Sequence, residues 1–334
     1  MLKSNRTKLI LGILVSAAFL YLAFRKVDFK QMVAAFAAAN YWYLLPAVAV
    51  IIFSHWLRAV RWGVLLKPIQ QVEVSPLFSS LMIGYLFNTF LPAHLGELVR
   101  AYLLGKKRPI SPSAVFGTIV IERIIDVFTL LVIMALTIVL FPFPPWVRTS
   151  GYLSFLFIFL LLLILVMMKR HREPSLRLVG QLTRPLPPHF GQKINELTNS
   201  FLDGIVPLKH WSHYVIVVVL SILIWVCYSF VFQLVFYAFD FVRLYSLPWL
   251  AALVLLVITT ISILVPSSPG YVGTYHYLCQ LSLSLFAVPA SPALTYAVIM
   301  HGMNFVPVLV VGLILLSVEG MSIKGIQKRV QEQE

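Results

Sequence analysis

Eight apolar runs, each long enough or nearly long enough to cross a bilayer as a helix, dominate this sequence. They lie at about 9–24, 42–57, 76–91, 114–141, 151–168, 213–239, 247–265 and 293–318. A helix needs roughly 20 predominantly apolar residues to span the hydrocarbon core. Because lipid offers no hydrogen-bond partner to the backbone, the pattern predicts an all-α, polytopic transmembrane helix bundle. We expect about 6 to 8 spanning helices in a single domain that covers residues 1–334.

The composition agrees with a membrane location and argues against two other classes. Of the 334 residues, 60% are hydrophobic and 11% are charged, against roughly 25% charged residues in soluble domains. The net charge of +14 does not indicate nucleic-acid binding, because the basic residues lie in short loops and at helix ends. Cys227 and Cys279 both lie inside apolar segments, so neither a disulfide framework nor a cysteine metal site is expected.

The basic residues also predict the orientation. The N-terminus, the segment at about 169–211 and the C-terminal tail are basic, and basic loops stay in the cytoplasm. Part of that segment, 192–205, has the apolar spacing of a short interfacial helix. The first apolar run follows basic residues as a signal peptide would, but no polar mature start comes after it. We therefore interpret it as a retained anchor and expect both termini in the cytoplasm.

Two of the apolar runs are interrupted in a way that suggests hairpins. Basic segments lie on both sides of run 76–91, and one simple crossing would place one of them outside. The conflict disappears if residues 76 to about 105 enter the membrane and return to the same side, with Pro92 and Gly96 at the tip. Residues 247–288 are broken similarly, and two such hairpins entering from opposite faces are typical of inverted repeats in transporters. Alternatively, all eight runs span and the breaks are loops.

The first break carries residues that hydrocarbon tolerates poorly. Asn88 lies one turn before Pro92, and His94, Glu97 and Arg100 follow at spacings of three. This spacing places the three on one helix face and allows Glu97 to pair with Arg100. Either these charges are solvated on an interfacial helix, or they line a path for a lipid headgroup, with Arg100 attracting phosphate and Glu97 holding it in place.

A second polar group, Glu122, Arg123 and Asp126, lies inside run 114–141. A charge at a helix centre costs about 2.5 to 3.5 kcal/mol, whereas an apolar residue returns only about 0.3 to 0.6. These charges must therefore lie near an interface, pair with other groups or face a hydrated interior. An interfacial position is available to Glu122 and Arg123, but less so to Asp126, which lies one turn deeper.

A third polar group surrounds the break at 265–276. Helix continuity is interrupted there by Pro266, Pro269, Gly270 and Gly273. A helix that restarts after Gly273 would direct its N-terminal amides at the break, where they could bind a lipid phosphate. His276 and His301 are candidates for proton carriers, metal ligands or buried histidines with satisfied hydrogen bonds. Without a nearby carboxylate or cysteine, a metal is the least favoured of the three.

Arg58 and Arg61, with Trp56 and Trp62, fit an anchor belt at the membrane interface better than a headgroup-binding role. The sequence contains no Walker loop, dinucleotide fingerprint or HExxH zinc helix, so we expect no cofactor.

Four segments, in order, carry a family resemblance: "RAVRWGVLL", "GYLFNTFLPAHLGELVRAYLL", "FGTIVIERIIDVF" and "PSSPGYVGTYH". Together they resemble the flippase-like integral membrane family related to the transmembrane region of lysylphosphatidylglycerol synthase, over nearly the whole chain. The resemblance implies a prokaryotic inner-membrane protein that moves or handles lipid-linked molecules, including aminoacylated phosphatidylglycerol. It places the family's polar residues at Asn88, Pro92, Gly96, Glu97, Arg100, Glu122, Arg123, Asp126, Pro269, Gly270 and Gly273.

The chain departs from the family pattern in two respects. Many relatives have a glycine and an acidic residue where this sequence has Tyr271 and His276. A histidine suits an anionic headgroup better than a carboxylate would. The synthases also carry a soluble aminoacyl-transferring domain after the membrane region, and this sequence stops soon after its last apolar run. We do not expect it to be a synthase by itself.

These observations predict a lipid transporter rather than an enzyme. In this hypothesis the three polar groups line a groove for the headgroup of a phospholipid or lipid-linked molecule, while its acyl chains stay in the bilayer. The expected partners are membrane lipids with anionic or lipid-linked headgroups, and not nucleic acid. The alternatives are a membrane transferase, with Glu97, Asp126 or His276 as general base, and an accessory subunit of a lipid-modifying enzyme.

Overall fold

The computed structural model describes residues 2–90, 95–141, 145–185, 187–204, 208–261 and 269–321. All regular structure within these ranges is helical, which confirms the all-α class. The α-helices are α1 Leu2–Phe24, α2 Phe29–Ala38, α3 Leu44–Leu66, α4 Val74–Phe90, α5 Gly96–Lys107, α6 Pro112–Leu140, α7 Pro145–Arg170, α8 Arg172–Leu182, α9 Pro188–Gly204, α10 Trp211–Ala238, α11 Phe241–Leu244, α12 Leu250–Ile261, α13 Thr274–Ser284 and α14 Ala290–Val318, and the 3-10 helices are η1 Tyr41–Tyr43 and η3 Pro269–Tyr271.

Four described helices are long and apolar enough to cross a membrane. They are Tyr41–Leu66, which joins η1 to α3, and the helices α6, α10 and α14, with lengths of 26 to 29 residues. Helices α1 and α7, of 23 and 26 residues, contain the first and fifth apolar runs. The protein is therefore a multi-pass membrane helical bundle, as its apolar pattern predicts.

Two pairs of helices are shorter. Helices α4 and α5 have 17 and 12 residues, and α12 and α13 have 12 and 11. At 1.5 Å per residue, α5, α12 and α13 are about 16 to 18 Å long, well short of the roughly 30 Å hydrocarbon core. The chain is therefore interrupted where the sequence analysis placed its two breaks. Pro92, His94 and Pro266 lie outside the described residues.

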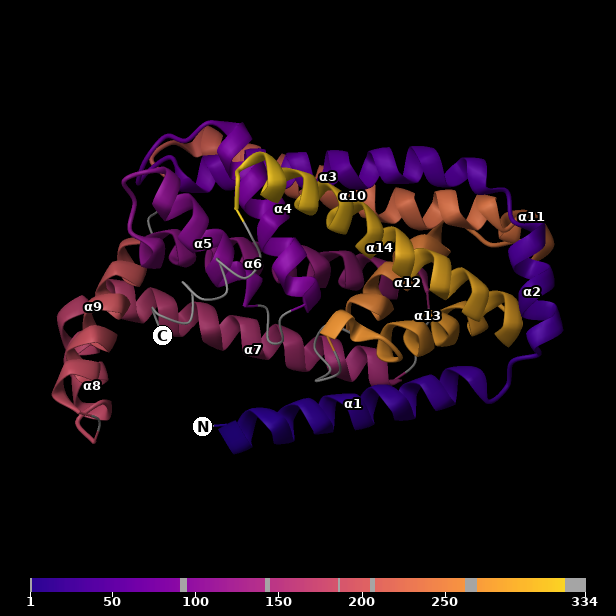
Figure 1. Ribbon diagram of the computed structural model, residues 1–334, viewed down its shortest axis with the longest axis horizontal. Coiled ribbons are helices and arrows are strands. Elements are labelled where there is room, and N and C mark those ends of the chain that lie inside the picture. The colour runs from indigo at the N-terminus through magenta and orange to yellow at the C-terminus, as the bar shows by residue number, and fades with distance from the viewer. Residues whose placement is uncertain are drawn as a thin grey trace.

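The bundle is elongated, and its two ends differ. Helices α8 and α9 lie at one end, and α2 and α11 lie at the other (Figure 1). The start of α4 and the ends of α5 and α14 line one pocket. Gly105 near the end of α5 is close to Pro112 at the start of α6, whose Gly117 in turn approaches Gly204 of α9. The α4–α5 pair therefore begins and ends at what we call the α8–α9 end.

The second short pair opens toward the opposite end. The side chain of Gln280 on α13 donates hydrogen bonds to the carbonyl oxygens of Ala23 (3.1 Å) and Ala290 (3.0 Å), at the end of α1 and the start of α14. Leu250, the first residue of α12, packs in one cluster with Phe141 and Phe286, which follow α6 and α13. The α12–α13 pair thus begins and ends at the α2–α11 end.

The segment at 169–211 is more helical than the sequence analysis predicted. The expected short helix at 192–205 corresponds to α9, which begins earlier, at Pro188, and α8 precedes it. Lys169 Nζ donates to the carbonyl oxygen of Leu202 (2.6 Å), and Arg172 pairs with Asp203 (2.7 Å). These contacts hold α9 against the end of α7 and the start of α8.

Candidate functional site

Charged side chains from three helices meet inside the bundle. We call them the charged cluster: Arg58 and Arg61 on α3, Glu97 and Arg100 on α5, and Glu122, Arg123 and Asp126 on α6. Asp126 is the fifteenth of the 29 residues of α6, so it lies about 21 Å from either end of the helix. The cluster is therefore deep within the length of a spanning helix.

Asp126 binds two arginines of α3. Arg61 Nη2 lies 2.6 Å from its Oδ1, and Arg58 Nη2 donates to its Oδ2. Arg61 also donates to Ser221 on α10 (2.9 Å), and Arg58 donates to the hydroxyl of Tyr85 on α4. Arg61 is 0% exposed and Arg58 is 7% exposed.

The prediction that Arg58 and Arg61 form an interfacial anchor belt is therefore wrong. Their helix continues to Leu66, and their i, i+3 spacing points both guanidinium groups at the carboxylates of α6. Trp62 is buried as well, and its ring stacks against the Arg100 guanidinium, 3.7 Å from the ring centroid. Only Trp56, which is 45% exposed, fits the expected belt.

Glu122 is the most deeply buried acid of the cluster. Its Oε2 lies 2.6 Å from Arg100 Nη2, and its Oε1 lies 3.6 Å from Arg61 Nη2. The side chain is fully buried, so Glu122 is not solvated at the surface of the bundle. The remaining options from the sequence, pairing or a hydrated interior, are resolved here in favour of pairing with arginine.

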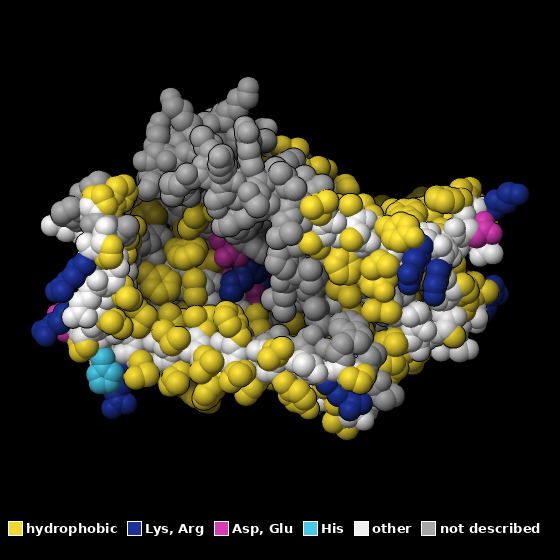
Figure 2. Space-filling view, turned by 90° about the horizontal axis from the view of Figure 1, so that it is seen from below, with side chains coloured by type: hydrophobic (Ala, Val, Ile, Leu, Met, Phe, Trp, Pro, Cys, Tyr) yellow, Lys and Arg dark blue, Asp and Glu magenta, His cyan; other side chains and the backbone are white. Residues whose placement is uncertain are grey.

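Glu97 pairs with Arg123 rather than with Arg100. Arg123 Nε donates to Glu97 Oε1 at 2.5 Å, so the predicted pair along α5 is wrong. Both residues of α5 face α6, where Glu122 and Arg123 are adjacent, and each finds an opposite charge across the helix interface. The Arg123 and Glu97 side chains are 33% and 14% exposed, the highest values in the cluster. Figure 2 shows acidic and basic side chains at the floor of a hollow bordered by hydrophobic side chains.

Asn88 and Gly96 position α5 against α4. The side-chain oxygen of Asn88 accepts a hydrogen bond from the Gly96 amide (2.8 Å), the first residue of α5. This satisfies one of the amides that a helix start leaves free. A Cβ on Gly96 would lie 2.0 Å from the carbonyl oxygen of Gly84, so the two backbones are almost in contact. The sequence placed Asn88 in a substrate path, but its amide group here caps a helix.

The second break is built around two glycines. Gly270 and Gly273 have φ values of 78° and 92°, a region that favours glycine. Helix α13 starts directly after Gly273, as the sequence analysis predicted. His301 Nε2 lies 2.8 Å from the Gly270 carbonyl oxygen, and the rings of His276 and His301 are 4.7 Å apart. The side chain of Pro269 lies outside the described residues.

These contacts favour buried histidines with hydrogen-bond partners over metal ligands. His276 Nδ1 also accepts from the Gly273 amide, at 3.4 Å. Within the described ranges, no group of three or more His, Cys, Asp or Glu side chains is arranged to hold a metal ion.

The second break lies beside the charged cluster. Helix η3 packs on α4, and Tyr271, at the end of η3, interacts electrostatically with both Arg123 and Glu97. The structure thus joins Glu97 and Arg100 of the first predicted group to the second group and places η3 of the third break on α4, next to them. The sequence analysis missed Tyr271 and the two α3 arginines as site residues. The arginines carried a usable signal, because their spacing of three residues places both on one helix face, as the spacing of four does for Glu122 and Asp126.

The comparisons with known proteins identify the family. The family described as "Lysylphosphatidylglycerol synthase TM region" matches residues 9–312. The chain belongs to this family. A UPF0104 membrane protein of Methanothermobacter thermautotrophicus is 22% identical over 84% of this chain and 86% of its own length. A second UPF0104 membrane protein, from Methanocaldococcus jannaschii, is 22% identical over 88% of this chain and 89% of its own length.

A third relative is similar over a shorter stretch. The glycosyltransferase AglD of Haloferax volcanii is 27% identical over 129 residues, which are 38% of this chain and 20% of that protein. All three relatives are archaeal. No solved structure matches the chain significantly.

In this member of the lysylphosphatidylglycerol synthase transmembrane family, the polar positions have distinct structural roles. Five of the positions implied by the resemblance belong to the charged cluster: Glu97, Arg100, Glu122, Arg123 and Asp126. Asn88 and Gly96 fix the α4–α5 pair, and Gly270 and Gly273 shape the second break. Glycine is required at 273 for packing too, because a Cβ there would lie 2.4 Å from the Ser16 carbonyl oxygen on α1.

Proposed function

We propose that this protein translocates or handles a phospholipid or lipid-linked molecule and that the charged cluster forms its headgroup path. The observation that carries the proposal is the Glu97–Arg123 pair, which is the partly exposed edge of an otherwise buried charge network at mid-helix depth. Ionisable groups inside a membrane are costly and usually line substrate or ion pathways. We further propose that the protein is a transporter and not itself an enzyme.

The charges of the cluster favour an anionic headgroup. Its four arginines and three acids leave one net positive charge. Arg100 is 1% exposed, and its Nε and Nη1 atoms have no hydrogen-bond partner among the described residues. Guanidinium groups bind phosphate through paired, charge-assisted hydrogen bonds. A phosphate group close to Arg100 and Arg123 would use this donor capacity.

The name of the family supports a role in lipid chemistry. The family is named after a synthase of lysylphosphatidylglycerol, an aminoacylated phospholipid. This name supports our proposal that the substrate is an anionic or lipid-linked molecule, and the archaeal relatives support a prokaryotic membrane. Nucleic acid has no place in this proposal.

The topology we propose follows from the two short helix pairs. The α4–α5 and α12–α13 pairs would enter the membrane from opposite faces and return, as in transporters built from inverted repeats. Seven Lys or Arg against three acids at 169–211 would place the α8–α9 end in the cytoplasm. Both termini would then be cytoplasmic. The breaks would meet near the midplane, where η3 packs on α4.

A reconstituted transport assay tests the proposal. Proteoliposomes would carry fluorescent anionic, zwitterionic or polyprenyl-linked lipids, and dithionite would quench those exposed outside. We expect headgroup-dependent movement with the intact protein and its loss in the Glu97→Ala, Arg100→Ala double variant. Arg172→Gln is the matched control, because it removes an arginine of the exposed pair with Asp203. Full transport by a folded double variant would refute the headgroup path.

The partial match to a glycosyltransferase supports an alternative proposal in which the protein works in lipid modification, either as a membrane transferase or as an accessory module of a lipid-modifying enzyme. Glu97 and Asp126 are both bound by arginine, which makes them poor candidates for a general base. Product formation by the purified protein from radiolabelled donors would establish a transferase. Tolerance of substitution throughout the charged cluster would favour the accessory role.

A further inference from the structure

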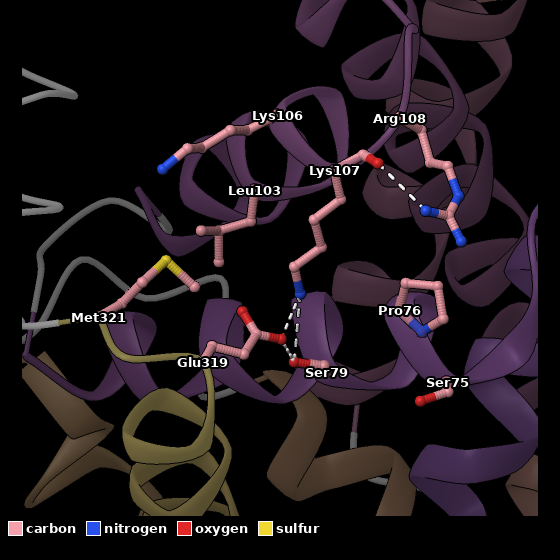
Figure 3. Close-up of a pocket in the computed structure, with 9 residues that line it drawn as sticks. All are labelled: Ser75, Pro76, Ser79, Leu103, Lys106, Lys107, Arg108, Glu319 and Met321. Atoms are coloured by element: carbon pink, nitrogen blue, oxygen red, sulfur yellow. Dashed lines mark hydrogen bonds and ion pairs between the residues drawn. The ribbon is translucent and has the colours of Figure 1, made fainter.

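A second polar site lies apart from the charged cluster, at the α8–α9 end. A cavity of about 510 Å³ opens between the start of α4 and the ends of α5 and α14. Its polar lining includes Ser75, Ser79, Lys106, Lys107, Arg108 and Glu319 (Figure 3). Lys107 follows Arg100 by seven residues on α5, so the cavity lies about 10 Å along the helix from the charged cluster.

The lining is predominantly basic. Three cations, Lys106, Lys107 and Arg108, stand against one acid, Glu319. Lys107 is directed into the cavity, where its ammonium group binds Glu319 and lies 3.4 Å from the Ser79 hydroxyl (Figure 3). Arg108 contacts only the carbonyl oxygen of Lys107 (3.1 Å) and, more distantly, the exposed Glu73 (3.6 Å) among the described residues. Lys106 is exposed and has no acidic partner among the described residues, so the three cations keep one positive charge beyond those that Glu319 and Glu73 pair.

The start of α4 adds further donors. Ser75 and Ser79 lie in the first two turns of α4, a helix of 17 residues. The first amides of a helix have no partner within it and carry partial positive charge. Hydroxyl groups, helix amides and basic side chains on one cavity are the donors that a phosphate group takes.

Compensation of the α5 dipole explains part of this arrangement, because cations are favourable in the last turn of a helix. It explains neither the cavity nor Arg108, which lies beyond the last turn.

We propose that this cavity binds a phosphate group, with Lys106, Lys107 and Arg108 as its basic ligands. Glu319, which pairs with Lys107, competes with the phosphate for the Lys107 ammonium group. The phosphate comes from an anionic lipid headgroup at the membrane surface or from free phosphate in solution. This proposal does not depend on transport, so the binding test of the cavity and the transport test of the headgroup path can fail independently.

The test measures ligand binding by the full-length protein purified in a neutral detergent. The probes are short-chain phosphatidylglycerol, short-chain phosphatidylcholine and inorganic phosphate, followed by native mass spectrometry. In the Lys106→Gln, Arg108→Gln double variant, which keeps the Lys107–Glu319 pair, phosphatidylglycerol should bind at least about tenfold more weakly, since each basic residue contributes about fivefold near an anionic lipid. The Lys30→Gln, Arg243→Gln double variant removes two exposed cations at the other end and should bind as the parent does.

Glu319→Gln gives a second, opposite readout. Removing the acid frees Lys107, so phosphatidylglycerol binding should become tighter by a few fold, whereas a purely structural ion pair would lower stability without strengthening binding. Binding of phosphatidylglycerol but not inorganic phosphate assigns the site to lipid. Binding of both shows that an anionic phosphate suffices, whereas the choline cation compensates the charge of the phosphate in phosphatidylcholine. Equal binding of phosphatidylcholine, or equal loss in both double variants, would overturn the proposal.

Discussion

Arg61 and Asp126, on α3 and α6, form a 2.6 Å ion pair in which the arginine side chain is fully buried. Asp126 holds Arg58 at the same time, so a single carboxylate pairs with two guanidinium groups in the interior of a membrane bundle. Without it, the two arginines would keep only the more distant carboxylate of Glu122, at 3.9 and 3.6 Å, and a poorly paired buried charge is strongly destabilising.

This arrangement predicts an asymmetry between the two ends of the pair. Asp126→Asn leaves both arginines without their shared carboxylate and should destabilise the protein by about 3 to 5 kcal/mol. Arg61→Met should cost less, because Asp126 keeps Arg58 and, at 3.8 Å, Arg123. Unfolding in detergent, followed by circular dichroism, measures both. Arg243→Gln breaks an exposed pair with Asp240 and serves as the control, with a change within about 1 kcal/mol. Equal losses in the two cluster variants would contradict the shared role of Asp126.

The Glu97–Arg123 pair should control lipid selectivity. If the headgroup path is correct, Arg123→Gln removes a partly exposed donor and should slow the movement of anionic lipids about tenfold or more, the effect of one charge-assisted hydrogen bond. Zwitterionic lipids should be affected less. The exchange variant Glu97→Arg, Arg123→Glu restores the ion pair and should fold like the parent. Its transport rate then shows whether the ion pair is sufficient or whether an arginine is needed at position 123 itself. Equal slowing of all lipids by Arg123→Gln would argue for a structural role.

Close backbone packing at Gly96 should be essential to the first hairpin. Gly96→Ala places a Cβ 2.0 Å from the Gly84 carbonyl oxygen, so α5 must shift away from α4 at an expected cost of about 1 to 3 kcal/mol. Gly302→Ala is a matched control on α14, where an added Cβ has no atom within 4 Å among the described residues. It should be neutral or stabilise by up to about 1 kcal/mol, because alanine favours helix. Thermal unfolding of the two variants gives the comparison, and an unchanged Gly96→Ala protein would mean that the hairpin packs more loosely.

The sequence predicted the elements of this fold better than their partners. Apolar runs located the long helices, and prolines and glycines located both breaks, because length and helix-breaking are local properties. The choice of partner for Glu97 is not local. Arg100 lies three residues away on the same helix, yet Arg123 on α6 takes the carboxylate. Only the packing of α5 on α6 decides between them.

The two arginines of α3 also show that the sequence alone does not determine which residues a charged side chain contacts. Apolar run 42–57 ends just before Arg58, so a reading by hydropathy places the membrane interface there. The helix nevertheless continues to Leu66, and its arginines are buried because α6 brings carboxylates to them. Hydropathy treats each residue as if it faced lipid, and it therefore misplaces charges that neutralise each other inside a bundle.

The orientation of the two short helix pairs can be decided by labelling single cysteines. In a background without Cys227 and Cys279, Glu73→Cys and Pro109→Cys flank the α4–α5 pair, and Leu244→Cys and Ser284→Cys flank the α12–α13 pair; all four positions are exposed. A membrane-impermeant maleimide added to intact cells and to inverted vesicles should label the first two from the cytoplasmic side and the last two from the other side. That result follows if each pair re-enters on the face where it began. Labelling of Glu73→Cys and Pro109→Cys from opposite faces would show that the α4–α5 pair crosses the membrane, and the inverted arrangement of the two breaks would be lost with it.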